Sequence, residues 1–432
     1  MAEPNFENRT LYHGDNLKFL RGMNSETVDL IATDPPFNKN RDFHATPDSL
    51  AAGAKFQDRW SWERDVHSDW VDQITDDYPR LMEAIESARF AHSDGMGAFM
   101  CFMAVRLLEM WRVLKPTGSL YLHCDPTASH YLKAVLDAIF GWRNFRNEIV
   151  WHYRRWTGKA KKFQQLHDTI FFYSKTKDYL FRVIHIDYTA GSRARKEQGV
   201  LHRFKRGHDP VLVSNKSVDK KGVPANDVWQ IPFIAPSAKE RIGYPTQKPL
   251  AVYERIIEAS SNEDDIVLDP FCGCATTPVA AERLGRQWVG IDIWDKAHDV
   301  VVDRLKNEVG LFGEVHYSKE PPTRTDDAQP AAPFLRVKQV HEPPGPKMSR
   351  AEMYEHLLDQ HGSRCQGCYR DFDDPRYLQL DHNVPRSDGG LNHISNRVLL
   401  CGPCNRLKSN IYTLSGLRRQ NKQLGYMSKD LL

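Results

Sequence analysis

The chain has 432 residues, of which 41% are hydrophobic and 27% are charged, and its formal net charge is only +3. A chain of this length is expected to form two or three domains, and its near-neutral balance excludes an argument for nucleic-acid binding from overall charge alone. No apolar run reaches membrane-spanning length, and the first residues lack the basic and then apolar pattern of a signal peptide. We therefore expect a cytoplasmic protein without a membrane partner.

The first informative motif is an acid placed directly after a short apolar run. Residues 28–33 are too few for a typical helix, and they are followed by Asp34, two prolines and Phe37. This pattern predicts a buried strand that ends at Asp34, in a loop that the prolines stiffen. Open α/β sheets bind ligands at the carboxyl ends of their strands, so the Asp34 carboxylate, the Pro35 carbonyl and the Phe37 ring are candidate site groups. Asp-Pro-Pro also forms ordinary turns, so this interpretation depends on a cofactor site elsewhere.

These groups suit the methylation of an exocyclic base amine. Such an amine is a poor nucleophile, because its lone pair is delocalised into the ring. Asp34 and the Pro35 carbonyl could each accept one of its N–H bonds, and Phe37 could stack on a base flipped out of the duplex. The Asp-Pro-Pro-Phe sequence at 34–37 resembles the catalytic motif of amino-methylating DNA methyltransferases.

A polar segment and a series of α/β elements come next. Residues 40–95 contain interspersed aromatic residues, which could close over a flipped base or simply anchor a long excursion to the core; they are Phe56, Trp60, Trp62 and Trp70. A helix at 103–111, a Pro-Gly turn and a strand at 119–125 form a doubly wound unit. The same pattern predicts a helix at 131–140 and strands at 147–151 and 169–173.

Basic residues gather between about 152 and 240. The first group is Arg154, Arg155, Lys159, Lys161 and Lys162, mixed with Tyr153, Trp156 and Phe163, and the second is Arg193, Arg195, Lys196, Arg203, Lys205 and Arg206. Phosphate contacts need such charge, and arginine can read guanine edges, although charge runs are also common on solvated surfaces. The resembling family carries its target-recognition segment at this place, which favours a DNA contact.

A strand, tight turn, helix and strand follow near residue 265. The first strand, at 265–268, leads into Asp269, and the second, at 287–292, ends at Asp292, roughly 20 residues later. In dinucleotide-type folds a distal acid at such a spacing holds ribose hydroxyls. Small residues at 273–275 let the backbone approach a ligand, and the N-terminus of the following helix favours an anionic group.

This segment resembles the S-adenosylmethionine motif of the same methyltransferases. The resemblance implies a set of cofactor-binding residues: Asp269, Phe271, Gly273, Thr276 and Asp292, with Thr246, Gln247 and Lys248 as the companion motif beside the methionine moiety. It also implies that Asp15, in a Gly-Asp-Asn turn, contacts the adenine of the cofactor, although polar strand-to-helix turns are equally common as plain structure. The usual Ser-Gly is Cys274-Ala275 here, and no nearby ligand set supports a metal at Cys272 and Cys274.

The order of the motifs indicates the architecture. A catalytic motif, a recognition segment and then a cofactor motif is the β-type arrangement of this family, and the match covers roughly residues 9–305. The expected fold is a Rossmann-like α/β methyltransferase sheet over 1–312, with the target-recognition segment inserted at 152–240. Asp34, where some members carry serine, favours adenine N6 as the methyl acceptor, although Asp-Pro-Pro-Phe does not exclude cytosine N4.

A second domain is expected at 348–432, after a proline-rich linker at 313–347. Four of the eight cysteines, Cys101, Cys124, Cys272 and Cys274, lie in apolar stretches and are expected to pack as small hydrophobic groups. The other four form two Cys-x-x-Cys pairs: Cys365, Cys368, Cys401 and Cys404. In a reducing cytoplasm these pairs predict a tetrahedral Zn²⁺ site rather than disulfides.

The sequence between and after the cysteine pairs resembles an HNH endonuclease, a small ββα-metal module. The resemblance covers roughly 350–412 and implies that His382 activates water, while Asp381 and Asn405 hold a catalytic Mg²⁺ or Mn²⁺. Asn396 would brace the loop that presents His382. The alternative is a zinc-stapled module that binds DNA without cleaving it.

Together these features predict an S-adenosylmethionine-dependent DNA amino-methyltransferase fused to an HNH nuclease. Both activities on one chain suggest a single-chain restriction-modification enzyme, with double-stranded DNA as the partner. One rival is a methyltransferase whose zinc module only binds DNA, and another is an RNA-modifying enzyme, since flipped-base chemistry also works on RNA. Whether the chain forms a homodimer is left open.

Overall fold

The computed structural model describes residues 3–46, 49–52, 54–154, 161–188, 191, 193–194, 200–203, 211–214, 222–310, 314–326, 348–384, 393–408 and 412–428. Within these ranges no helix combines the length and the apolar character needed to cross a membrane. Several basic residues predicted to contact DNA lie outside the described residues, namely Arg155, Lys159, Arg195, Lys196, Lys205 and Arg206 together with Trp156.

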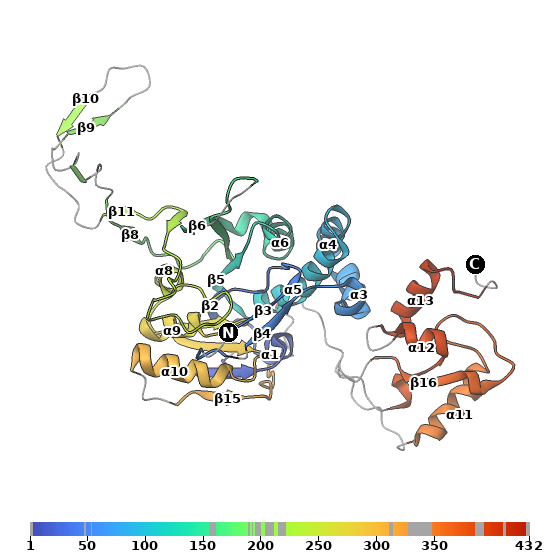
Figure 1. Ribbon diagram of the computed structural model, residues 1–432. Helices are drawn as coiled ribbons and strands as arrows, with labels where there is room; N and C mark the ends of the chain where they lie inside the picture. The colour runs from blue at the N-terminus through green and yellow to red at the C-terminus, as the bar shows by residue number, and fades with distance from the viewer. Residues whose placement is uncertain are drawn as a thin grey trace.

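The larger part of the chain forms a nine-stranded sheet in the order β12-β6-β7-β5-β2-β13-β14-β1-β15 (Figure 1). The strands are β1 (Thr10–His13), β2 (Val28–Thr33), β5 (Leu114–Cys124), β6 (Phe145–His152), β7 (His167–Ser174), β12 (Val228–Gln230), β13 (Ile266–Asp269), β14 (Gln287–Asp292) and β15 (His316–Ser318). All neighbouring strands pair in parallel except β7, which is antiparallel to β5 and β6. We refer to this part as the sheet domain.

Helices cover both faces of this sheet. One face packs against α1 (Asn16–Gly22), α4 (Pro79–Ala91), α5 (Asp94–Val113) and α6 (Ser129–Leu136), the last extended by the π-helical turn η1 (Asp137–Gly141) and the 3₁₀ turn η2 (Trp142–Asn144). The other face packs against α8 (Leu250–Ser260), α9 (Thr276–Arg283) and α10 (Ala297–Val309). Alternation along β2 shows why: Ile31 is buried in the first core, whereas Leu30 and Ala32 are buried in the second. The predicted doubly wound α/β fold is confirmed.

The polar segment after β2 contains a hairpin and short helices rather than an irregular loop. It forms β3 (Arg41–His44), β4 (Lys55–Asp58), α2 (Trp62–Asp65) and α3 (Ser68–Asp77). Trp60, Trp62 and Trp70 pack against the core beneath α5, so these aromatic residues anchor the segment. Phe56 instead faces a cavity described below. The anchoring alternative therefore describes three of the four aromatic residues.

The target-recognition segment contributes two small antiparallel pairs among its described residues. They are β8 (His185–Ile186) with β11 (Val223–Pro224), and β9 (Val200–Arg203) with β10 (Val211–Ser214). Of the predicted DNA-contacting residues, Arg154, Lys161, Lys162 and Arg193 are exposed, as is Phe163. Exposure of both charged and aromatic side chains is compatible with a nucleic-acid contact and with an ordinary solvated surface.

The described start of the predicted linker belongs to the sheet domain. Residues 316–318 add β15 to the edge of the sheet beside β1. Further along, Asn24 donates to Thr325 at 2.9 Å, and the backbone N–H of Ser25 donates to Asp326 at 2.7 Å. Clustered prolines indicate a stiff chain rather than a detached one, and the domain extends to at least residue 326 rather than ending at 312.

The C-terminal unit is a small ββα arrangement. It comprises α11 (Arg350–His361), the 3₁₀ turn η3 (Pro375–Tyr377), β16 (Leu378–His382), the 3₁₀ turn η5 (Ile394–Asn396), β17 (Arg397–Cys401), α12 (Gly402–Lys408) and α13 (Leu414–Gln423). The two strands pair antiparallel, with Leu380 opposite Leu399. A capping box between Ser349 and Glu352 starts α11, because the two side chains satisfy the backbone N–H groups at the start of the helix.

Candidate active site

Three acids lie at the carboxyl ends of three adjacent parallel strands. Asp34 follows β2, Asp269 ends β13, and Asp292 ends β14. All three line one cavity of about 140 Å³. The other predicted residues that line it are Pro35, Phe37, Thr246, Gln247, Lys248, Phe271, Gly273 and Thr276. The sheet order therefore brings the predicted catalytic and cofactor motifs to one cavity.

Asp15 is the exception among the predicted residues of this site. Its side chain, which is 56% exposed, caps α1 by accepting from the backbone N–H of Leu17 at 3.0 Å, and it pairs with Arg106 at 2.7 Å. The neighbouring Asn16 instead donates to the carbonyl of Pro270 at 2.7 Å. Pro270 belongs to the loop after β13, which carries the predicted S-adenosylmethionine motif and is called the cofactor loop below. Asn16 was not among the predicted site residues, although it belongs to the same Gly-Asp-Asn turn.

Asp269 and Asp292 hold the loops that carry the cofactor motif. Asp269 accepts from the Thr33 hydroxyl at 2.7 Å, and burial raises its pKa to about 7 although hydrogen bonds act in the opposite direction. Asp292 accepts from the backbone N–H groups of Gly273 and Trp294, both at 2.8 Å, and burial also raises its pKa. Gly273 has φ +50°, and a Cβ there would lie 3.1 Å from the Tyr244 ring, so the tight turn requires glycine.

Asp34 is held between two basic side chains. Lys248 Nζ lies 2.5 Å from Asp34 Oδ2, and His123 Nδ1 lies 3.6 Å from Asp34 Oδ1. Lys248 also lies 4.9 Å from the centroid of the Phe37 ring. The resemblance implied that Lys248 lies beside the methionine moiety of the cofactor, whereas in the structure its ammonium group forms an ion pair with Asp34. Gln247 accepts from the N–H of Ile242 at 3.0 Å and so stabilises its own loop.

Several residues outside the predicted set line the same cavity. They are Phe43, Asp58, Tyr244, Tyr253 and Trp294, and they are joined by Phe56, one of the aromatic residues expected either to close over a base or to anchor its segment. Phe43 and Phe56 are opposite one another in the β3–β4 hairpin and stack with centroids 4.9 Å apart. Asp58 accepts from the backbone N–H groups of Asn38 and Lys39 at 2.6 and 2.9 Å, which fixes the loop after Phe37. No local pattern marked this hairpin, because its strands are only four residues each.

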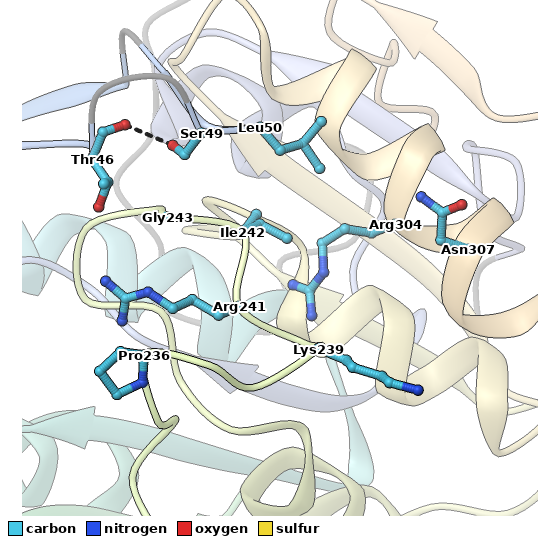
Figure 2. A pocket seen from close by; sticks show the side chains of 10 residues that line it. All are labelled: Thr46, Ser49, Leu50, Pro236, Lys239, Arg241, Ile242, Gly243, Arg304 and Asn307. Atoms are coloured by element: carbon cyan, nitrogen blue, oxygen red, sulfur yellow. Dashed lines mark hydrogen bonds between the residues drawn. The ribbon is translucent and has the colours of Figure 1, made fainter.

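A second, more basic cavity of about 420 Å³ lies beside the cofactor loop (Figure 2). Its lining includes Lys239, Arg241 and Arg304, and none of its lining residues is acidic. Arg304 donates to the backbone carbonyl of Cys274 at 2.6 Å. Because Cys274 lines the first cavity and Arg304 lines the second, this hydrogen bond links the two cavities. The surplus of positive charge suits an anionic group such as a backbone phosphate.

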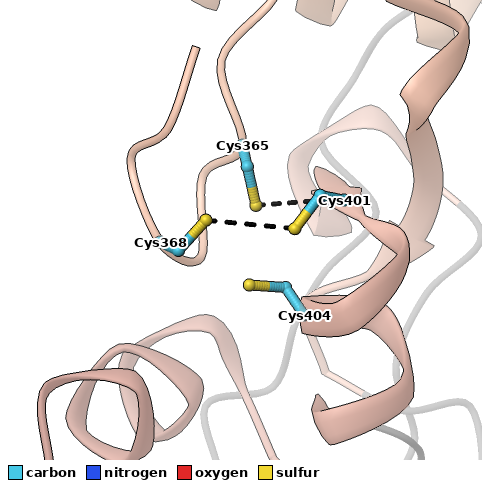
Figure 3. Close-up of side chains that lie close together, drawn as sticks. All are labelled: Cys365, Cys368, Cys401 and Cys404. Carbon is cyan, nitrogen blue, oxygen red and sulfur yellow. Dashed lines mark hydrogen bonds between the residues drawn. The ribbon is translucent and has the colours of Figure 1, made fainter. Parts of the chain in front are cut away.

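The four cysteines of the C-terminal unit form one cluster (Figure 3). Their sulfur atoms all lie within 4.8 Å of one another, and the Sγ atoms of Cys368 and Cys401 are 3.9 Å apart. Tetrahedral Zn²⁺ with Zn–S bonds of about 2.3 Å requires sulfur atoms about 3.8 Å apart. None of the four is in a disulfide. The donor set and its spacing fit a four-thiolate zinc site.

The predicted nuclease residues lie around the end of β16. His382 ends the strand, and its Nδ1 is 3.2 Å from a guanidinium nitrogen of Arg397. Asn396 accepts from the N–H of Val384 at 2.7 Å and donates to its carbonyl at 3.0 Å, so it clamps the chain just after His382. Residues 385–392, which belong to the segment that resembles the HNH module, lie outside the described residues.

The two predicted cation ligands make protein contacts here. Asp381 Oδ2 lies 3.0 Å from the Nζ of the buried Lys408, and the Asn405 side chain donates to Gln379 at 2.6 Å. Lys408 was not among the predicted site residues, and the sequence offers no signal that it would reach Asp381. A cation bound by Asp381 and Asn405 requires these contacts to be shared or exchanged.

An open α/β sheet with acids gathered at adjacent strand ends defines a cofactor-binding α/β domain, and family models identify it further. The model described as DNA methylase matches residues 28–303, more than half of the chain, and the model described as HNH endonuclease matches residues 365–410. The chain therefore belongs to the DNA methylase family and carries a C-terminal HNH endonuclease region. Both predicted resemblances are confirmed.

Individual relatives agree with this assignment. The type II methyltransferase M.HpaI of Haemophilus parainfluenzae is 29% identical over 300 residues, which cover 69% of this chain and 74% of M.HpaI. The DNA adenine methyltransferase YhdJ of Escherichia coli K12 is 29% identical over 291 residues, 66% of this chain and 79% of YhdJ. The solved structure of the cytosine-N4-specific PvuII DNA methyltransferase aligns at a TM-score of 0.41 and 17% identity, covering 73% of this chain and 91% of that one. Because that TM-score is low, the assignment to the DNA methylase family rests on the match to the family model and not on this structural alignment.

Proposed function

We propose that the sheet domain transfers a methyl group from S-adenosylmethionine to an exocyclic base amine of double-stranded DNA, with adenine N6 favoured. The observation that carries this proposal is the single cavity that Asp34 shares with Asp269 and Asp292. A carboxylate suited to hold a nucleophilic amine thus lies beside a loop suited to a nucleotide-like cofactor. The resident cofactor would supply the electrophilic methyl group.

The geometry around Asp34 supports its proposed role. Lys248 forms an ion pair with Asp34 Oδ2, while Asp34 Oδ1 is buried and has no hydrogen-bond partner among the described residues. Oδ1 and the Pro35 carbonyl would accept the two N–H bonds of the amine, drawing its nitrogen toward tetrahedral geometry and freeing the lone pair. Phe37 would stack on the flipped base. Asp292 would hold the ribose hydroxyls of the cofactor, and contact of Asp15 with its adenine stays a prediction.

The base specificity is the first property to measure. Asp34 in place of serine favours adenine, and the relative YhdJ is by name an adenine methyltransferase. DNA modified by the purified protein and digested to nucleosides should therefore contain N6-methyladenine by mass spectrometry. DNA incubated without the enzyme is the control. Detection of N4-methylcytosine alone would replace adenine by cytosine, the alternative that the Asp-Pro-Pro-Phe motif allows.

For the C-terminal unit we propose phosphodiester hydrolysis in DNA, with His382 activating water. Support comes from the HNH match, from the position of His382 at the end of β16 and from the clamp that Asn396 forms just after it. Asp381 and Asn405 would hold Mg²⁺ or Mn²⁺, which stabilises charge at the scissile phosphate. Zn²⁺ at the four thiolates would be structural, because it leaves no open position for water.

If the two activities form a single-chain restriction-modification enzyme, methylation should protect plasmid DNA from cutting. Unmodified plasmid with Mg²⁺ or Mn²⁺ should be cut into discrete fragments, whereas plasmid premethylated by the same protein should stay intact. His382→Ala should abolish cutting and leave methyl transfer unchanged, while the matched variant His356→Ala, exposed on α11, should behave as wild type. Cutting of both plasmids would separate the nuclease from methylation.

No cutting of either plasmid would instead favour the alternative, a module that binds DNA without cleaving it. Competition between duplex DNA and RNA for methyl transfer tests the RNA-modifying rival. Homodimer formation and cytoplasmic location stay predictions.

A further inference from the structure

We propose that His123 receives the proton that the base amine loses during methyl transfer, passed on by Asp34, and that Asp168 sets the tautomer of His123 for this purpose. The inference rests on the proposed methyl transfer and adds a route for the proton to it. It starts from a buried line of three side chains, which are contributed by three neighbouring strands of the sheet. None of the sequence motifs includes His123 or Asp168.

The line runs from the cavity into the sheet. His123 lies near the end of β5, and its side chain is only 2% exposed. Its Nδ1 is 3.6 Å from Asp34 Oδ1, and its Nε2 is 3.3 Å from Asp168 Oδ2. Phe37 and Trp151 flank the imidazole, with ring centroids 5.6 and 5.5 Å away. The imidazole is therefore shielded from bulk water and lies between two carboxylates.

The far carboxylate decides which imidazole nitrogen carries hydrogen. Burial raises the pKa of Asp168, but the hydrogen bond to His123 and the charge of a protonated His123, followed by the charges of Lys248 and Lys39, outweigh it, so the pKa is lower than usual. The Tyr153 hydroxyl donates to its other oxygen at 3.3 Å. An ionised Asp168 is an acceptor, so Nε2 must carry hydrogen and donate to it. In neutral His123 this leaves Nδ1 as a bare acceptor facing Asp34.

The atoms facing the amine are also without competing partners. Neither His123 Nδ1 nor Asp34 Oδ1 has a hydrogen-bond partner among the described residues, although both atoms are buried. Two bare acceptors 3.6 Å apart repel one another, and a single proton between them removes the repulsion. Leaving buried polar atoms without a hydrogen bond costs free energy. We therefore infer that a proton joins His123 Nδ1 and Asp34 Oδ1 during function. Methyl transfer delivers one proton at this place.

Methyl transfer and the proton transfer that follows conserve atoms and charge. The amine nitrogen forms a bond to the methyl carbon, the sulfur–carbon bond breaks, and its electron pair stays on sulfur. The amine nitrogen then carries a positive charge and two hydrogens, one of which passes to Asp34 Oδ1. Asp34 transfers the proton to Nδ1 of neutral His123, which becomes an imidazolium between two carboxylates. The product is the neutral methylamino base, and the positive charge rests on His123.

The charged neighbours favour this final position of the proton. Asp34 and Asp168 flank His123, and Tyr153 also faces Asp168. The two nearby cations are otherwise paired, since Lys248 bonds Asp34 and Lys39 bonds Asp125. Lys248 reduces the ability of Asp34 to retain the proton itself. His123 is therefore the group to which the proton moves next.

The test compares His123→Gln with wild type in single-turnover methyl transfer across the neutral pH range. Glutamine still forms hydrogen bonds but does not titrate. The wild-type rate should rise with pH, because only a neutral imidazole can accept the proton. The variant should be slower by roughly 100-fold, at the lower end of what general bases contribute, and its rate should lack this rise. His130→Asn, exposed on α6, should match wild type.

A second readout does not depend on activity. Nitrogen NMR of histidine-labelled protein should show the Nε2–H tautomer at a resonance that is lost in His123→Gln. Asp168→Asn should shift that resonance toward the Nδ1–H tautomer, because the asparagine amide can donate to Nε2.

Three results would overturn the proposal. His123→Gln could keep the wild-type rate and its rise with pH. It could lose activity only because binding of S-adenosylmethionine or DNA is lost, which would make His123 a purely structural residue. The NMR signal could show an Nδ1–H tautomer in the wild type. Absence of any methyl transfer by wild type would instead refute the proposed function, and the tautomer measurement would remain independent of it.

Discussion

Asp34→Asn is expected to reduce methyl transfer at least about 100-fold, as removal of a group that stabilises a transition state typically does. The change keeps the shape of the side chain but not its hydrogen-bonding pattern. Lys248 Nζ lies 2.5 Å from Oδ2 and needs an acceptor there, so it will hold the amide oxygen of asparagine. The amide NH₂ then replaces Oδ1 and points donors at the N–H bonds of the target amine. Two donors facing each other cannot orient the nucleophile.

The loss should lie in the chemical step and not in binding. Single-turnover methyl transfer gives the rate, calorimetry gives affinity for S-adenosylmethionine, and 2-aminopurine fluorescence reports base flipping. Asp299→Asn is the matched control, because that side chain is 80% exposed on α10. A rate for Asp34→Asn within tenfold of wild type would refute the role of Asp34. Loss of cofactor affinity with an unchanged rate at saturation would make it a binding residue.

Cys404→Ser is expected to release Zn²⁺ and unfold the C-terminal unit while the sheet domain stays folded. Structural zinc sites contribute on the order of 10 kcal/mol or more to folding at neutral pH. The hydrophobic core of this unit is small, and the four cysteines themselves are part of it. Without metal, a cluster of thiols replaces the bonds that join the Cys365–Cys368 turn to the start of α12. The remaining core is too small to compensate.

Tryptophan provides an internal control for this experiment. All ten tryptophans lie between Trp60 and Trp294, so their fluorescence shows whether the sheet domain stays folded. Hydrogen exchange of residues 378–382 and 397–408 should become fast in Cys404→Ser, and the zinc content should fall from one equivalent to none. Arg376→Gln, with a side chain 88% exposed in the same unit, should keep its zinc. Slow exchange in metal-free Cys404→Ser would show that the unit folds without zinc.

Local sequence determined the elements and the residue types of both sites. The strand ending before Asp34, the strand at 287–292 and the strand at 169–173 all form where the pattern predicts them. The reason is that apolar alternation, capping residues and turn residues act over a few positions of the chain. The acids at strand ends could be predicted for the same reason, because a strand delivers its last residue to the edge of its sheet.

The length of α5 shows where local patterns are incomplete. The helix extends over 94–113 instead of 103–111 and is buried along most of its length. A helix surrounded by protein needs no polar stripe, so the amphipathic pattern that marks a helix is weak in its first half. Likewise β15 is three residues long and is stable only because β1 pairs with it.

Only the tertiary structure decided which side chains meet. Lys248 and Asp34 are 214 positions apart in the chain, yet they form an ion pair because α8, which begins just after Lys248, packs against β2. The order of the strands places His123 between Asp34 and Asp168, and the β3–β4 hairpin adds its phenylalanines to the cavity. Strand order depends on contacts between distant segments, which no short stretch of sequence encodes. The sequence by itself thus determined the chemical groups and the strand ends that carry them, and the packing of the sheet determined their partners.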